Sequence, residues 1–259
     1  MIMRKWLYIL LVLGIWSCVG QKDDPEPDPE PPVPEVPGGK TEGTRFFRRV
    51  LALEFTGTWC QYCPNMTEAL EEAQQLRPWR LVEVAMHAYD DYSPACADEI
   101  IARFNVSGYP TMVLDMDAGT AFNTQTSSIM TGYVDKVIEQ NACGLALSCV
   151  DGVLTVKIKT VEEGEYALGV TVVEDGLIAY QTGYGADYVN NAVLRRYLSH
   201  VGGDGLGALK ADTEVTRTYE AKLGEKERVV AYVIKGGKCI NALSCKDKET
   251  IPYTYEEDD

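Results

Sequence analysis

Hydrophobic and polar positions follow one pattern in the first half of the chain and another in the second half. In the first half, short continuous apolar runs predict buried strands at residues 50–55, 81–87 and 112–114. Apolar residues at helical spacing between and after these runs predict helices at residues 66–76, 94–104 and 129–138. This alternation of strands and helices predicts an α/β domain, which we place at residues 44–142.

Beyond residue 140, apolar positions alternate with polar ones, as in strands that are buried on one face. The strand-like runs are residues 153–158, 166–173, 177–182, 213–221, 228–234 and 240–244. Glycine-containing turn signals such as Asp175-Gly176 separate these runs. This succession of short strands with turns between them predicts an all-β, immunoglobulin-like sandwich domain at residues 143–250. The stretch 187–207 is too long for a simple turn.

The N-terminus has the pattern of an export signal. A basic pair precedes an apolar run of ten residues, 6–15, which is much shorter than the roughly 20 residues that a membrane-spanning helix needs. Such a run is typical of a secretory signal peptide, and the following Ser17-Cys18 resembles a bacterial lipobox. This resemblance implies a lipoprotein signal peptide at residues 1–17 and a lipid, such as palmitate, on Cys18. The alternative is a plain signal peptide with an incidental cysteine.

Acidic residues are concentrated towards the two ends of the chain, whose formal net charge is −15. Residues 18–43 are rich in proline and acidic residues, so we expect them to form a disordered tether behind the lipid anchor. Residues 251–259 form an acidic tail. Because so negative a chain repels a phosphate backbone, we expect no nucleic-acid partner. The expected contact with a membrane is through the lipid anchor.

A Cys-x-x-Cys motif lies between the first predicted strand and the first predicted helix. Trp59, Cys60 and Cys63 give the pattern W-C-x-x-C, and the sequence G-Y-P-T follows at residues 108–111, ahead of the third predicted strand. A Cys-x-x-Cys in this position is typical of redox proteins, and no close second pair completes a four-ligand zinc set. The two motifs, in this order and at this separation, resemble the thioredoxin family and imply a thioredoxin-like fold for residues 44–142.

The position of the motif at a helix N-terminus predicts which cysteine reacts. The helix dipole and the free N–H groups stabilise a thiolate, so we expect Cys60 to be the nucleophile and Cys63, one turn later, to be the resolving thiol. The resemblance to thioredoxins implies that Glu54 is a buried acid that exchanges a proton with Cys63. It also implies that Tyr109–Pro110 is a cis peptide beside the cysteines and guides an extended substrate peptide.

Three interpretations of the motif stay open. In the first, the chain is a thiol–disulfide oxidoreductase that acts on protein thiols or disulfides without a cofactor. Gln61 and Tyr62 replace the Gly-Pro pair of the common pattern, so the sequence does not give the direction of electron flow. In the second, the disulfide is an inert staple in a binding module that contacts an unknown surface partner. In the third, His87 converges with the two cysteines, as in copper-carrying relatives of thioredoxin.

The layout of the whole chain also resembles a known family. The lipobox, the tether, the W-C-x-x-C-P sequence, the N-x-x-V-L-R sequence at residues 190–195 and the sequence Ile240-Asn241-Ala242 occur in this order. They resemble the twenty-eight-kilodalton outer-membrane-protein-related lipoproteins of Bacteroidota. The resemblance implies a location at the outer membrane, facing the periplasm or the cell surface.

Four further cysteines lie in two similar segments, CGLALSC and CINALSC, as Cys143, Cys149, Cys239 and Cys245. Six residues of extended strand span about 20 Å, too far for a bridge within one strand. Two bridges between the segments are possible, as are local bridges across a turn, and the sequence does not choose between the pairings. We predict structural disulfides here rather than a metal site. Cys96 is then the odd thiol, which is either a small buried residue, a second redox partner or unpaired.

Overall fold

The computed structural model describes residues 38–140 and 142–257. The predicted signal peptide, Cys18 and the tether as far as residue 37 lie outside the described residues. The chain from Val36 to Asp259 is one compact unit. Part of the predicted tether belongs to this unit, because the backbone of Lys40 pairs with that of Tyr255.

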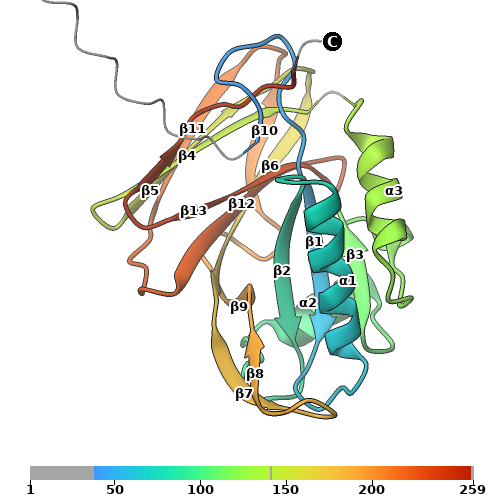
Figure 1. Cartoon of the computed structure of the whole chain (residues 1–259). Coiled ribbons are helices and arrows are strands. Elements are labelled where there is room, and N and C mark those ends of the chain that lie inside the picture. The colour runs from blue at the N-terminus through green and yellow to red at the C-terminus, as the bar shows by residue number, and fades with distance from the viewer. Residues whose placement is uncertain (1–37, 141, 258–259) are drawn as a thin grey trace, which may run out of the picture. The chain divides into compact units, whose positions relative to one another are not determined.

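Three strands form the half of the fold that carries the Cys-x-x-Cys motif (Figure 1). β1 (Val50–Thr56) lies between β2 (Leu81–His87), to which it is parallel, and β3 (Thr111–Leu114), to which it is antiparallel. The helices are α1 (Cys63–Leu76), α2 (Ala97–Phe104) and α3 (Ser127–Val137), with a short 3-10 turn, η1 (Ala118–Thr120).

The helices cover both faces of these strands because both faces are apolar. β1 is buried along its whole length. Val50 and Ala52 face a core that α1 and α3 complete with Leu70 and Met130. Leu51, Leu53 and Phe55, on the opposite face, pack with α2. A strand buried on both sides reads as a continuous apolar run in the sequence, which is why residues 50–55 are recognisable without an alternating pattern.

The rest of the described chain is almost entirely strand, and the predominance of β-structure is confirmed there. The strands are β4 (Gly144–Val150), β5 (Val153–Lys159), β6 (Gly164–Glu174), β7 (Leu177–Gln181), β8 (Gly185–Asn190), β9 (Val193–Tyr197), β10 (Asp204–Leu209), β11 (Glu214–Glu220), β12 (Glu227–Lys235), β13 (Lys238–Lys246) and β14 (Glu249–Ile251). β13, β12, β6 and β9 continue the sheet of β2, β1 and β3, with β10 on β6. β11, β5, β4 and β14 form a second sheet, and β7 and β8 form a separate hairpin.

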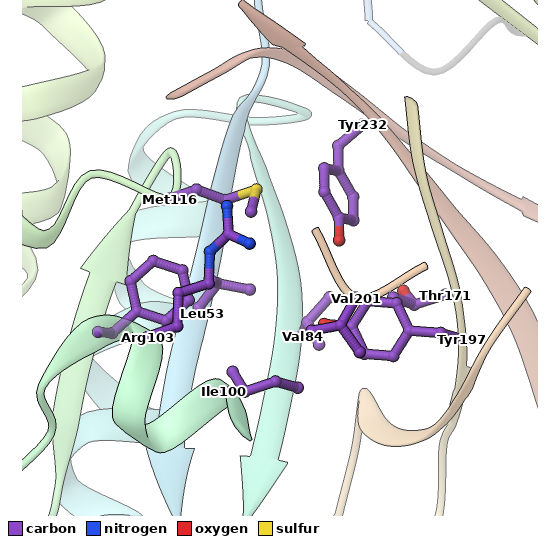
Figure 2. A pocket seen from close by; sticks show the side chains of 10 residues that line it. Leu53, Val84, Ile100, Arg103, Met116, Thr171, Tyr197, Val201 and Tyr232 are labelled. Atoms are coloured by element: carbon purple, nitrogen blue, oxygen red, sulfur yellow. The ribbon is translucent and has the colours of Figure 1, made fainter. Parts of the chain in front are cut away.

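The predicted sandwich differs from an isolated domain, because one of its two sheets is continuous with the strands of the first half. Side chains that alternate along β12 point to two cores. Val229 and Val233 face the second sheet, whereas Val230 and Tyr232 face α2 and β1. Figure 2 shows this junction, where Leu53 of β1 and Tyr232 of β12 line one small enclosed space. A break at residue 142/143 would therefore cut through a shared core.

The acidic C-terminal residues also belong to the fold as far as they are described. Glu256 accepts hydrogen bonds from the Arg80 guanidinium at 2.7 and 2.8 Å, and its backbone N–H donates to the Arg45 carbonyl. Tyr255 stacks on Phe46, with ring centroids 4.8 Å apart. Paired charges and an aromatic contact thus hold residues that the acidic composition marks as a tail. Among the described residues, no helix is long and apolar enough to cross a membrane.

Candidate active site at the Cys60–Cys63 disulfide

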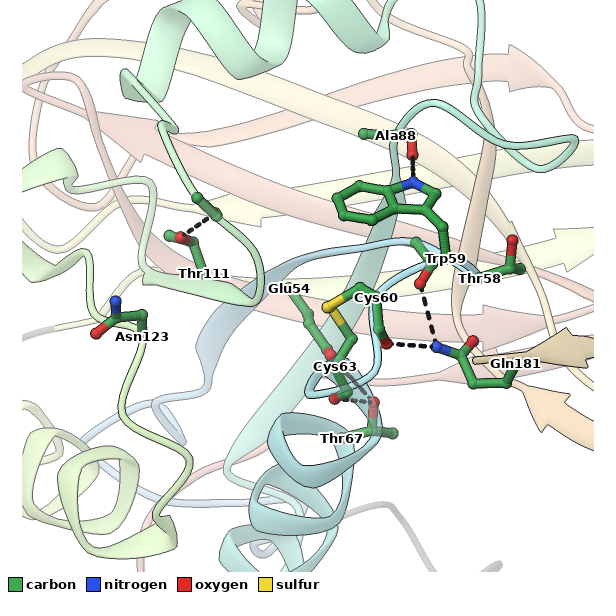
Figure 3. The surroundings of a disulfide bond; sticks show 12 residues. Glu54, Thr58, Trp59, Cys60, Cys63, Thr67, Ala88, Thr111, Asn123 and Gln181 are labelled. Carbon is green, nitrogen blue, oxygen red and sulfur yellow. Dashed lines mark hydrogen bonds between the residues drawn. A yellow bond between two sulfur atoms is a disulfide. The ribbon is translucent and has the colours of Figure 1, made fainter. Parts of the chain in front are cut away.

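Cys60 and Cys63 are joined by a disulfide at the point where the loop after β1 enters α1 (Figure 3). The Cys60 N–H donates to the Gly57 carbonyl at 3.0 Å, and the Cys63 N–H donates to the Cys60 carbonyl at 3.4 Å. Pro64 occupies the first turn of α1, where the missing N–H would have no partner within the helix. Cys60 is 5% exposed and Cys63 is 1% exposed, so Cys60 is the more accessible of two buried sulfur atoms.

Glu54 lies beneath the disulfide, beside Cys63 (Figure 3). Its side chain comes from β1 and is buried. Thr67 of α1 connects the Glu54 carboxyl to the backbone of Cys63, because its hydroxyl lies 3.0 Å from Glu54 Oε1 and 3.4 Å from the Cys63 carbonyl oxygen. Burial raises the pKa of Glu54 well above its usual value, and the nearby charge of Glu83 raises it further. The hydrogen bond from Thr67 opposes this shift only in part.

Glu83 is a second carboxyl on the same face of the sheet. It lies on β2 and pairs with Ala52, which is two residues before Glu54 on β1. Its side chain is half-buried. Burial raises the pKa of Glu83 to about 7, against the opposing effect of the Arg228 guanidinium. The sequence does not reveal this neighbour, since the pairing register of β1 and β2 is needed to bring the two carboxyls together.

Aromatic side chains flank the exposed side of the disulfide. Trp59 is 44% exposed and donates its indole N–H to the Ala88 carbonyl at 2.8 Å. Its ring centroid lies 5.3 Å from that of Tyr109, which in turn lies 6.2 Å from Tyr89. The Tyr109–Pro110 peptide bond is cis, which confirms the prediction. Trp59 and Tyr109 therefore meet beside the cysteines, although they are 50 positions apart in the chain.

The β7–β8 hairpin closes the other side of the site, which the sequence did not predict. The Gln181 side-chain amide donates to the carbonyls of Gly57 and Cys60 at 3.2 and 2.8 Å (Figure 3). The Thr182 N–H donates to the Thr58 carbonyl at 2.9 Å. The Tyr184 hydroxyl contacts Asn65 Oδ1 at 2.7 Å. The available sequence signal was a polar Gln at the end of a predicted strand, which is too common to identify a site residue.

A small, mostly enclosed space lies under the hairpin, between β1, β2 and α1. Its lining residues include Glu54, Thr67, His87, Gln181 and Tyr188. Burial raises the pKa of Tyr188 to about 12, while its hydrogen bond to Thr67 lowers it. The hairpin thus adds a neutral phenol to the polar groups beside the buried acid.

His87 is held by a carboxylate. It is 1% exposed, and its Nδ1 lies 2.8 Å from Asp90 Oδ2. The same carboxylate oxygen accepts the Thr58 N–H at 2.8 Å, so Asp90 ties His87 to the loop that leads to Cys60. Across the part of the chain that the structure describes, no group of three or more His, Cys, Asp or Glu side chains is arranged to hold a metal ion.

The four cysteines of the second half carry free thiols in the structure, where the sequence predicts structural disulfides. Cys143, Cys149, Cys239 and Cys245 are all buried. Their segments largely coincide with β4 and β13, which lie in different sheets and pack against each other in the core between the two sheets rather than pairing edge to edge. Cys96 is also a free thiol, half-buried just before α2.

One comparison with known proteins gives a family, and another gives a fold. A family model described as outer membrane protein Omp28 matches residues 97–250. The structure of HBP35 of Porphyromonas gingivalis is similar at a TM-score of 0.62 and 22% identity, covering 82% of this chain and 78% of that chain. A protein from Agrobacterium tumefaciens is similar at a TM-score of 0.60 and 13% identity, covering 80% of this chain and 97% of that one. No curated protein sequence matches. At such identities the two structures show a shared fold alone.

Proposed function

The chain belongs to the outer membrane protein family Omp28, and from this membership and the Cys60–Cys63 pair we propose that it is a lipid-anchored, extracytoplasmic, thioredoxin-like thiol–disulfide exchange protein. The observation that carries the proposal is the placement of the disulfide at the first turn of α1, with the carboxyl of Glu54 buried beneath it. A helix N-terminus stabilises a developing thiolate, and a buried neutral carboxyl can supply a proton to it.

Because the two cysteines form a disulfide in the structure, we write the reaction from the oxidised protein. A substrate thiolate attacks the Cys60 sulfur, a mixed disulfide forms, and the Cys60–Cys63 bond breaks. Cys63 leaves as a thiolate and takes the proton of Glu54. A second substrate thiolate then attacks the substrate sulfur of the mixed disulfide and releases Cys60 as a thiolate. The substrate dithiol loses two electrons and releases its two protons to solvent, and the protein gains the electrons as a Cys60 thiolate and a Cys63 thiol. Glu54 then takes a proton back from solvent. The reverse sequence reduces a substrate disulfide, and the potential of the pair decides the direction.

Aromatic residues beside the pair support a polypeptide substrate. Trp59 and Tyr89 are exposed, and both are linked by ring contacts to Tyr109, which precedes Pro110. An extended peptide can place apolar side chains on such rings while its backbone approaches the loop before β3. Protein thiols and disulfides are therefore the proposed substrates.

Trapping of the mixed disulfide tests this function. In the Cys63→Ser variant, the Cys60 thiolate should attack a substrate disulfide and stay bound to it, giving a reductant-sensitive adduct in non-reducing gels. The Cys60→Ser variant should give no adduct and should not reduce insulin or a model peptide. A wild-type chain without activity over a range of redox buffers contradicts the proposal.

A redox-inactive surface lipoprotein is the second candidate, and the low exposure of Cys60 favours it. The β7–β8 hairpin presents Ile178, Tyr180 and Tyr184 to solvent, and exposed aromatic residues are frequent in protein interfaces. A Cys60/Cys63 double variant that retains every partner of the wild type in a pull-down, together with an inactive wild type, supports this function instead.

The membrane anchor is the third part of the proposal. It rests on the lipobox-like Ser17-Cys18 sequence and on membership of an outer membrane protein family. Replacing Cys18 by Ser should move the chain from the membrane fraction to the soluble fraction. A variant that stays with the membrane contradicts the anchor but leaves the exchange reaction untouched.

A further inference from the structure

The β7–β8 hairpin belongs to the second half of the chain and contacts the loop at residues 57–60, which carries Cys60 and is called the reactive loop below. In the described part of the chain, its two strands pair only with each other. The neck of the hairpin is braced, because Asp175 accepts the Ala192 N–H at 2.8 Å and Asn191 accepts the Gly176 N–H at 2.9 Å. Arg228 of β12 holds the same Asp175 at 3.0 Å. These bonds hold the base of the hairpin together and connect it to β12.

The tip of the hairpin reaches the reactive loop through Gln181. This side chain is 2% exposed, and its amide group donates to the carbonyls of Gly57 and Cys60. A side-chain amide has two N–H donors, so both can be used here. The Thr182 N–H adds a bond to Thr58. Three carbonyl groups of the loop that carries Cys60 are thus held by two consecutive residues of the hairpin.

We propose that Gln181 is a positioning residue for the reactive cysteine: by holding the Gly57 and Cys60 carbonyls, it keeps Cys60 at the N-terminus of α1 when the disulfide is open. The inference rests on the proposed function, because it takes Cys60 as the attacking sulfur. Reduction removes the covalent tie between Cys60 and Cys63. The hydrogen bonds from the hairpin remain, and the helix stabilises a thiolate only within its first turn.

Loss of the amide donor should therefore raise the pH at which Cys60 becomes a thiolate. Titratable groups surround the loop that carries Cys60. Glu54 on β1, His87 at the end of β2 and Tyr188 on β8 line the space that Gln181 also lines. Asp90, after β2, accepts the Thr58 N–H, and the Tyr109 ring contacts that of Trp59. All of them are unchanged in a Gln181 variant. A shift in the Cys60 titration can then be assigned to the position of the loop rather than to a lost charge.

Alkylation of the reduced, full-length protein by iodoacetamide, followed at the Cys60 peptide by mass spectrometry from pH 4 to 10, gives the test. Gln181→Met keeps a similar volume and removes both donors without adding a charge. This variant should alkylate Cys60 roughly tenfold more slowly below the midpoint, which corresponds to about one unit in the thiolate pKa. Ala186→Ser, an exposed change on the other strand of the same hairpin, should keep the wild-type profile.

Circular dichroism shows whether the Met variant folds, and Gln181→Asn, whose amide sits on a side chain too short to reach both carbonyls, replaces it if it does not. A folded Met variant, or the folded Asn variant in its place, with the wild-type midpoint overturns the inference. The failure of the proposed function has a different signature. If the wild-type protein gives no turnover while the Cys60 midpoint still moves in the Gln181 variant, the result contradicts the exchange reaction but supports the positioning role of Gln181.

Discussion

At the scale of single residues, the sequence predicts the members of the site that belong to local motifs and misses those that come from elsewhere. Cys60, Cys63 and Glu54 lie within ten positions of one another, and a strand followed by a helix is enough to bring them together. Glu83 and Gln181 need the pairing register of β1 with β2 and the path of a distant hairpin. No local pattern carries that information.

The buried carboxyl of Glu54 should make stability depend on pH. Because its pKa is higher in the folded protein than in the unfolded chain, the folded state keeps a proton that the unfolded state releases. The free energy of unfolding must then fall as pH rises above the unfolded value, by at most about 1.4 kcal/mol per pH unit for one proton.

Glu54→Gln removes this loss, so the variant should gain stability relative to the wild type as pH rises from about 4.5 towards neutrality. Urea denaturation of the oxidised protein at pH 4.5, 6 and 7.5 measures the difference. Glu72→Gln, an exposed change on α1, is the matched control. A difference between Glu54→Gln and wild type that stays constant with pH would show that Glu54 is ionised in the fold.

At the scale of elements, the sequence predicts a strand or helix most accurately where its apolar residues form a continuous run or repeat with a regular period. The run predicted at residues 81–87 is β2, and the run at 153–158 is β5 with one further residue. The long stretch 187–207 contains most of β8, all of β9 and part of β10. β8 and β10 are largely exposed, so they lack the apolar alternation on which strand prediction depends.

The thiols of β4 and β13 give a test at this scale. Burial raises the pKa of Cys143 and of Cys245 to about 12, and the thiolate is the form that reacts. In the folded, non-reduced protein at pH 8, iodoacetamide should therefore leave Cys143, Cys149, Cys239 and Cys245 unlabelled. All four should be labelled after unfolding in urea without reductant.

Peptide mass spectrometry distinguishes this outcome from the disulfides that the sequence predicts. The internal control is the peptide that carries Cys60 and Cys63, which should be labelled only after reduction. If these four thiols also require reductant in the unfolded chain, they are bridged between the two sheets in the exported protein.

At the scale of the whole molecule, the first and second halves of the chain are joined by buried polar bonds as well as by a shared sheet. Asn241 of β13 is 1% exposed. Its side chain accepts the Arg49 N–H at 2.9 Å and donates to the carbonyls of Phe47 and Cys143 at 3.1 and 2.8 Å. The sequence marked Ile240-Asn241-Ala242 as a family feature, but only the fold shows that Asn241 connects three segments.

This connection predicts a single cooperative unfolding transition. Apart from two tryptophans in the first 16 residues, the chain carries Trp59 and Trp79 alone, both in the first half, whereas most strands lie in the second. Tryptophan fluorescence and far-UV circular dichroism therefore report on different halves. Because Val230 and Tyr232 of β12 complete the core under β1 and α2, neither half can unfold without exposing the other, and the two signals should share one urea midpoint.

Asn241→Leu should destabilise both halves together. The substitution keeps a similar volume but removes the buried hydrogen bonds that Asn241 makes with the Arg49 and Ala242 N–H groups and with two carbonyls. This loss should lower the free energy of unfolding by roughly 2–5 kcal/mol. Both optical signals should move to the same lower midpoint, while Asn123→Leu, at an exposed loop position, should shift neither appreciably. If the fluorescence midpoint stayed in place while the circular dichroism midpoint fell, residues 44–142 would be an independent domain, and the shared sheet would contribute little to the stability of the site it supports.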